Sequence, residues 1–200
     1  ALIDAAQYTG ETRFLGAATE LADWTIEHLR ASDGSFYDTP HDPSARGGLK
    51  KRNRSILENA VLAEALLRLS QMTWVEDYTD AARDALTAFS HSYKAYGHYI
   101  AGYARAVDLC LNAPVHVTVV GAYGDARSHE LLRAALKPYV ASRVVQLIDP
   151  ERDVQLHRRS GFPAQTEEPT AYVCRGRESY AETTDAERLP ALMTRTDGTL

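Results

Sequence analysis

The chain contains little cysteine and no long apolar segment. Its 200 residues include two cysteines, Cys110 and Cys174, which excludes a scaffold held by several disulfides and fits a reducing compartment such as the cytoplasm. The most apolar stretch, residues 115–122, is too short to span a bilayer. The first residues do not have the pattern of a secretory signal. We therefore expect a cytoplasmic protein without a membrane partner.

The chain also lacks the charge pattern of a nucleic-acid-binding protein. Its formal net charge is −5, and the densest basic run, residues 50–54, is predicted to be a solvated loop rather than a phosphate or RNA contact. The turn at 121–125 lacks the third glycine of a dinucleotide-binding fingerprint, and the sequence has no phosphate-binding Gly-Lys-Ser/Thr loop. We expect no nucleic-acid partner and no cofactor.

What the chain does contain is an internal repeat between residues 1–30 and 65–94. A shift of 64 positions aligns similar residues in the two segments: Leu2-Ile3 with Leu66-Leu67, Thr9 with Thr73, Phe14 with Tyr78, and Ala17-Ala18 with Ala81-Ala82. Each segment is predicted to contain a helix end, a turn and a longer Ala-rich helix. Such a repeat indicates stacked helical hairpins; the alternative is two unrelated amphipathic helices that are both rich in alanine.

The pattern of apolar residues changes near residues 112–114. Before this point, three- and four-residue spacings predict helices over 11–29, 56–69, 77–90 and 99–111. After it, β-branched runs predict strands at 115–120, 143–148 and 170–174, with helices over 128–139 and 185–193. Ser128 is the expected N-cap of the first of these two helices. We expect helical hairpins in residues 1–112 and a small α/β region in residues 113–200.

The connection at residues 32–55 holds the best candidate for chemistry. Phe36 and Tyr37 offer flat apolar faces to a sugar ring, and Asp38 can accept hydrogen bonds from hydroxyl groups or act in acid–base catalysis. The alternative is a structural turn, in which Phe36 fills the core and Asp38 caps the next segment. Two histidines are further candidates because imidazole titrates near neutral pH: His41 in this loop and His98 at the start of the fourth helical stretch.

Several motifs, in order, resemble the C-terminal part of one family. They are Thr-Gly-Glu-x-Arg-Phe-Leu, Asp-Gly-Ser-Phe-Tyr-Asp-Thr, Asn-Ala-Val-Leu-Ala-Glu-Ala-Leu-Leu-Arg-Leu and the closing Ala-Tyr-Val-Cys-Arg-Gly. They are similar to the thioredoxin-domain-containing proteins related to spermatogenesis-associated protein 20. The resemblance implies an N-terminal thioredoxin-like domain joined to an (α/α)6 toroid like those of N-acylglucosamine 2-epimerase and six-hairpin glycosidases. On that basis we expect a mainly α fold, with a partial toroid followed by the small α/β region.

The resemblance also implies a fragment and a function. Residues 1–6 look like the end of a helix, so the thioredoxin-like domain and the first hairpins would lie upstream. In a carbohydrate-active enzyme, Asp38 and His98 would be the acid–base groups, with Phe36, Tyr37, His41 and Asn59 binding a sugar-like substrate. Two departures from the family pattern question this activity: Glu58 replaces a small residue, and Ser179 replaces the second cysteine of a Cys-x4-Cys pair.

The competing hypothesis is a non-catalytic helical scaffold that docks a partner or the upstream thioredoxin-like domain. Half a toroid would leave an apolar helix face exposed, which predicts dimerisation through that face. The two hypotheses differ in the chemistry of the cavity: an active toroid should present several carboxylates and aromatic rings inward, whereas a scaffold should have a plugged or apolar centre.

Overall fold

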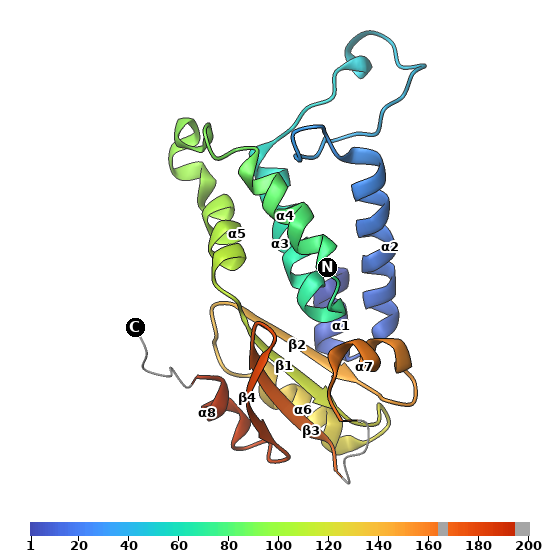
Figure 1. The fold of residues 1–200 in the computed structure, drawn as a ribbon, viewed down its shortest axis with the longest axis vertical. Coiled ribbons are helices and arrows are strands. Elements are labelled where there is room, and N and C mark those ends of the chain that lie inside the picture. Colours follow the sequence, from blue (N-terminus) through green and yellow to red (C-terminus); the bar gives the residue numbers. More distant parts are fainter. Residues whose placement is uncertain (164–167, 195–200) are drawn as a thin grey trace. The chain divides into compact units, whose positions relative to one another are not determined.

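The computed structural model describes residues 1–163 and 168–194 and contains two compact units. The α/β unit consists of Ala1–Gly16, Gln71–Trp74 and Ala113–Leu200, and the helical unit consists of Ala17–Ser70 and Val75–Asn112. Figure 1 shows both units in the colours of the sequence. The N-terminal residues and the short 71–74 segment therefore belong with the C-terminal half of the chain.

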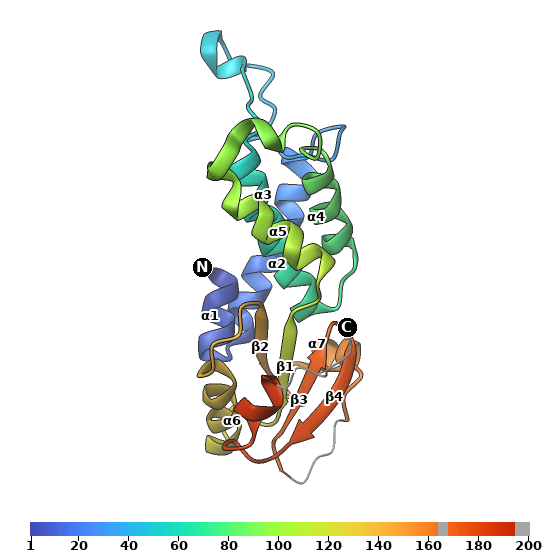
Figure 2. The ribbon, with the colours of Figure 1, turned by 90° about the vertical axis from the view of Figure 1, so that its left-hand side faces the viewer.

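A four-stranded mixed sheet forms the centre of the α/β unit. Its strands are β1 (Val115–Val120), β2 (Arg143–Ile148), β3 (Thr170–Arg175) and β4 (Glu178–Thr183). They lie in the order β2-β1-β3-β4, which can be followed across Figure 2. β1 and β2 are parallel and joined through α6 (Ala126–Leu136), whereas β3 is antiparallel to both β1 and β4.

All six residues of β1 are buried, so this strand is covered on both faces of the sheet, where the β-branched run that predicted it packs well. Val115, Val117 and Val119 point to one face and form a core with residues of α6 and of α8 (Leu189–Met193). The alternate residues of β1 point to the other face, where Val120 joins Tyr172 and Cys174 in a second cluster. That second face also carries buried polar side chains, described below.

The first helix, α1 (Leu2–Thr9), covers the β2 edge of the sheet. The Gln7 side-chain oxygen accepts a hydrogen bond of 2.8 Å from the Val145 backbone N–H. This contact satisfies a buried donor that an edge strand would otherwise leave unpaired. The N-terminal helix is thus part of the α/β unit rather than of a helical hairpin.

The expectation of a mainly α toroid is wrong. The structure is an α/β mixture, about 53% helical, with a four-stranded mixed sheet. Two features of the sequence hid this. The edge strand β4 is mostly polar, and Tyr180 and Ala181 are its only apolar residues, so it lacks the alternation of apolar and polar residues that marks a strand. The helix α1 looks like part of a helical hairpin, although it packs beside the sheet.

The helical unit is built from four helices, which run alongside one another in Figure 1. These are α2 (Thr12–Leu29), α3 (Ile56–Thr73), α4 (Asp77–Thr87) and α5 (Ala101–Leu111), with short 3-10 segments at Gly47–Lys50 (η1) and Tyr93–Ile100 (η2). Small buried side chains allow close approach of the helices: Ala18, Ala22, Ala60, Ala63, Ala81, Ala82, Ala85 and Ala106. Two tyrosine hydroxyls bridge elements, Tyr78 to Asp23 at 2.6 Å and Tyr103 to the Leu86 carbonyl at 2.8 Å.

The repeated segments share a local geometry. Gly10 follows α1 with a φ of 72°, and Trp74, at the same place in the second segment, follows α3 with a φ of 57°. Each is a left-handed residue that ends one helix before the next begins. Glycine adopts this conformation without steric cost, whereas a tryptophan needs compensating contacts.

Other differences from the expected elements are local. The N-cap of α6 is Asp125, whose carboxylate accepts a 2.9 Å hydrogen bond from the Arg127 N–H, and not Ser128. The last helix begins at Leu189 rather than at 185, and α7 (Val154–Ser160) was not predicted. In the described part of the chain, the helices are either too short or too polar to cross a membrane.

Candidate functional site

The connection that carries the candidate residues folds back on the end of α2. The Ala31 N–H donates to the Ser35 carbonyl at 2.7 Å, and the Tyr37 N–H donates to the Leu29 carbonyl at 2.9 Å. Gly34 makes this reversal possible because it has a φ of 88° and a Cβ at this position would lie 2.7 Å from the Asp84 Cβ. The turn is therefore set by backbone geometry and close packing.

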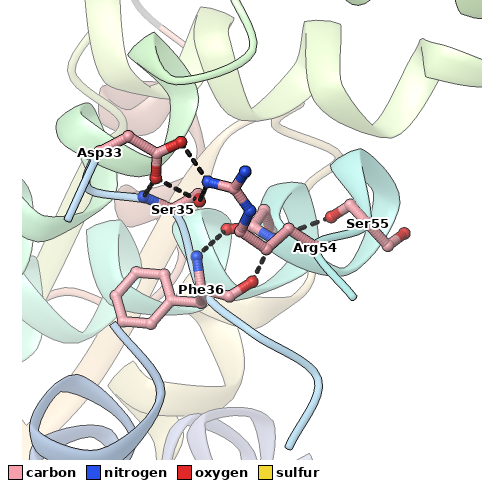
Figure 3. Close-up of polar contacts among 6 residues, drawn as sticks. Asp33, Ser35, Phe36, Arg54 and Ser55 are labelled. Carbon is pink, nitrogen blue, oxygen red and sulfur yellow. Dashed lines mark hydrogen bonds and ion pairs between the residues drawn. The ribbon is translucent and has the colours of Figure 1, made fainter. Parts of the chain in front are cut away.

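An Asp–Ser–Arg cluster closes the turn (Figure 3). One Asp33 carboxylate oxygen accepts from the Ser35 hydroxyl at 2.6 Å and from the Ser35 N–H at 3.1 Å. Arg54 pairs with the other oxygen and donates to the Ser35 hydroxyl at 3.2 Å. The hydrogen bond from the Ser35 hydroxyl is the main cause that lowers the pKa of Asp33, with the Arg54 guanidinium adding to it. The Asp33 carboxylate is therefore ionised and paired at neutral pH.

Asn59, on α3, holds the backbone of Phe36. Its side-chain oxygen accepts from the Phe36 N–H at 2.7 Å, and its amide nitrogen donates to the Phe36 and Ser55 carbonyls, both at 2.9 Å. Figure 3 shows these contacts around Phe36 and Ser55. Asn59 is 2% exposed and Phe36 is 3% exposed. The Asn59 amide thus uses its hydrogen-bonding capacity on the chain itself, and the Phe36 ring packs in the core.

Tyr37 is half-buried, Asp38 is exposed, and both have partners within the chain. The Arg52 guanidinium carbon lies 3.7 Å from the centroid of the Tyr37 ring, a cation–π contact. Asp38 accepts from the Asn53 N–H at 2.9 Å and from the Asn53 side-chain amide at 3.2 Å. The bond from the Asn53 backbone is the largest cause of the lowered pKa of Asp38. Asp38 is ionised at neutral pH, so it can act as an acceptor or a base there, whereas a general acid needs a raised pKa.

The two candidate histidines lie apart from these contacts. His41 is exposed in the loop. His98 is exposed on η2, and its ring packs against Tyr99 with 4.1 Å between ring centroids. The structure therefore brings Phe36 and Asn59 into direct contact and places Asp38 two residues from Phe36, while His98 belongs to a separate aromatic segment with Tyr96 and Tyr99.

Sequence reasoning missed the arginines that complete the loop. Residues 50–54 form a mostly exposed loop, as predicted, and within it Arg52 covers Tyr37 and Arg54 binds Asp33. A signal was present in Asp33-Gly34-Ser35, which is a typical Asx turn, with a carboxylate that accepts from a backbone N–H two residues later. Because this turn uses only one oxygen of the Asp33 carboxylate, the other oxygen can pair with a basic side chain. Arg54, at the end of the same loop, is close enough in sequence to supply it.

Metal-ligating side chains do not gather into a group in the ranges 1–163 and 168–194. No group of three or more His, Cys, Asp or Glu side chains is placed there to hold a metal ion. Cys174 on β3 is buried, and burial raises the pKa of its thiol. A buried, protonated thiol is a poor nucleophile. Comparison of the chain with known protein families, with curated proteins and with solved structures found no match.

Proposed function

We propose that this chain is a non-catalytic binding module and that its helical unit carries the binding surface. One observation supports this proposal most strongly: the buried polar and aromatic groups of the 32–55 connection are committed to its own folding. Asn59 holds the Phe36 backbone, and Phe36 fills the core. At the surface, Arg52 covers Tyr37 and Asn53 holds Asp38. A loop built in this way is a rigid structural element.

Exposed apolar side chains on two helices support the binding role. On α2, Leu21 is 57% exposed and Trp24 is 44% exposed; on α3, Leu57 is 47% exposed and Val61 is 69% exposed. Each pair is spaced by one helical turn, so its two members lie on the same face of their helix. Apolar helix faces of this kind are typical of surfaces that bind another protein.

Site-specific photocrosslinking tests this surface. A photoreactive side chain at position 61 should cross-link one discrete protein in the cells that produce the chain, and the same group at Arg83, 58% exposed on α4, should not. Support requires that the purified partner binds the purified chain and that Val61→Glu reduces the affinity at least tenfold. Equal labelling from both positions, or unchanged affinity of the variant, would overturn the proposal.

The enzymatic alternative has its own test. If the chain turns over a sugar and Asp38→Asn abolishes that turnover without unfolding the protein, the chain is an enzyme and the binding-module proposal fails. Turnover that is unchanged in the variant would remove Asp38 from the mechanism.

Carbohydrate binding is a second candidate, supported by the aromatic segment of η2. Tyr99 is 71% exposed, Tyr96 is 42% exposed, and the His98 ring lies against Tyr99. Exposed planar rings can stack on the apolar face of a sugar. Titration with a panel of mono- and disaccharides should shift the NMR signals of Tyr99, and Tyr99→Ala should remove binding. Tyr139→Ala is the matched control because Tyr139 is 91% exposed and lies in the α/β unit; equal loss in both variants would exclude an η2 site.

A further inference from the structure

The second face of the sheet contains a buried histidine held by neutral groups. His116 on β1 is 2% exposed, and Gln146 on β2 is also 2% exposed. The His116 Nε2 lies 3.1 Å from the Gln146 amide nitrogen and 3.2 Å from the Thr118 hydroxyl. An amide nitrogen can only donate, so the His116 Nε2 accepts and the imidazole is neutral with its proton on Nδ1.

Trp74 packs on this histidine in spite of a strained backbone. The two ring centroids are 5.4 Å apart, and the Trp74 ring also meets Phe162 edge-on at 6.4 Å. Trp74 has a φ of 57°, in the left-handed region that bulky side chains rarely adopt. Packing against the sheet must therefore hold Trp74 in place.

Among the described residues, the groups that face His116 directly carry no negative charge, and a carboxylate on the same face of the sheet, that of Glu182 on β4, lies opposite Tyr172, two strands away from β1. Cys174 lies opposite it on β3, and Tyr172 lies opposite Thr118; burial raises the pKa of both side chains, so both are neutral near pH 7. On β2 the facing residues are Val144 and Gln146, and from outside the sheet the facing rings are those of Trp74 and, beyond it, Phe162. Another histidine, His157 on α7, follows Leu156, which shares a small hollow with Gln146. An imidazolium at this position would have no ion-pair partner among the residues that the structure describes.

The Gln146 amide is only half satisfied. Its nitrogen donates toward His116 and Thr118, whereas its oxygen is buried and has no hydrogen-bond partner. Gln146 also lines a hollow with room for about one water molecule. Protonation of His116 would place an N–H donor against the amide N–H2, and the amide would have to rotate or separate from the ring.

We propose that His116, Gln146 and Trp74 form an acid-sensitive latch, in which protonation of His116 breaks its hydrogen bond with Gln146 and releases the Trp74 indole from the sheet. The latch does not depend on the binding function proposed above. Because Trp74 ends α3, its release also frees the last turn of that helix. Opening of the latch makes the 71–74 segment mobile under acidic conditions while the sheet stays folded.

The difference in the pKa of His116 between the closed and the released state gives the size of the pH effect on release. Burial lowers the pKa of His116 from 6.5 to about 4, and release returns it toward its ordinary value. Between pH 8 and pH 5, the equilibrium constant for release should therefore rise about 30-fold. The released state binds the proton that the closed state excludes, so acid favours release.

Hydrogen exchange of the Trp74 indole N–H measures this equilibrium in the intact chain. After correction for intrinsic exchange, its protection should fall about 30-fold from pH 8 to pH 5, while the backbone amides of Val117 and Val119 stay protected. The chain has two tryptophans, and Trp24→Phe assigns the signals. Equal losses at Trp74 and Val117 would mean global acid unfolding, and an unchanged Trp74 protection would mean that no latch exists; both results overturn the proposal.

Two variants identify the titrating group. His116→Gln should remove the acid-dependent loss of Trp74 protection, and the matched control His157→Gln should retain it. Retention of the loss in His116→Gln would overturn the proposal. If His116→Gln does not fold, nitrogen-15 NMR of the wild-type imidazole decides: the latch requires the Nδ1–H tautomer at neutral pH, and the Nε2–H tautomer would exclude it.

Discussion

At the scale of single residues, Asn59 shows how one side chain can organise a loop. Its amide makes three hydrogen bonds, to both backbone groups of Phe36 and to the Ser55 carbonyl. Loss of the amide leaves buried backbone groups without partners, and such groups are costly because no water replaces the bond. The Asn59 position is therefore central to the stability of the helical unit.

Asn59→Ala should lower the free energy of unfolding by about 2–4 kcal/mol. Asn53→Ala is the matched control because Asn53 is exposed and its partners can bind water instead, so we expect a loss below about 1 kcal/mol. Urea denaturation followed by circular dichroism measures both values. Similar losses in the two variants would show that the Asn59 contacts are not special.

His116 predicts a pH dependence of global stability. Its pKa is about 4 in the folded chain and 6.5 in an unfolded one. The unfolded state binds the proton first, so the stabilisation is complete above about pH 6.5 and is lost as the pH falls toward 4. The total loss should be about 3 kcal/mol, measured by urea denaturation at pH 7.5 and at intervals down to pH 4.5. A curve of the same slope in His116→Gln would contradict this assignment.

At the scale of secondary structure, two glycines should respond in opposite directions to substitution by alanine. Gly16 lies inside α2 with open space around its Cα, whereas Gly34 has a φ of 88° and touches Asp84. Gly16→Ala should raise the free energy of unfolding by about 0.5–1 kcal/mol through helix propensity. Gly34→Ala should lower it by at least about 1 kcal/mol through strain and contact. Thermal unfolding compares the two, and a shift of the same sign would contradict the structure.

Most of the elements could be predicted because their signals are local. The periodicity of α2 through α5 and the β-branched composition of β1 and β2 are readable within one window of sequence. Elements that depend on neighbours were missed: β4 is a polar edge strand whose pairing with β3 supplies its stability, and α7 is seven residues long. The Asp125 cap was missed because Ser128 is also a good capping residue, and only the geometry of the turn selects between them.

In the candidate loop, too, the local features could be predicted and the contacts with distant residues could not. The sequence correctly located a Gly turn beside two aromatic residues, but it left both a sugar-binding and a structural role open for Phe36 and Asp38, and it did not predict the contact of Asn59 with Phe36. The deciding contacts join residues 23 positions apart. Such contacts form only when α3 packs beside the end of α2, so no local pattern reveals them.

At the scale of the whole molecule, the exposed apolar side chains predict weak self-association when no partner is present. Val61 and Leu57 lie on one face of α3 and are largely exposed. Sedimentation velocity should show a weight-average mass that rises with concentration, and Val61→Glu should reduce the rise. Tyr139→Glu, which alters an exposed side chain of the α/β unit, should leave it unchanged. A monomer at all concentrations, or equal effects of the two substitutions, would contradict the prediction.

Short-range patterns in the sequence were enough to predict the helices α2 to α6, the strands β1, β2 and β3, the change of pattern near residue 113 and the repeated helix–turn–helix unit. These depend on side-chain periodicity and turn chemistry, which act over a few residues. The tertiary structure decided the rest. It placed α1 at the edge of the sheet through Gln7, buried Phe36 under the Asn59 clamp, and enclosed His116 beneath Trp74, because burial and hydrogen-bond partners come from residues that only folding brings together.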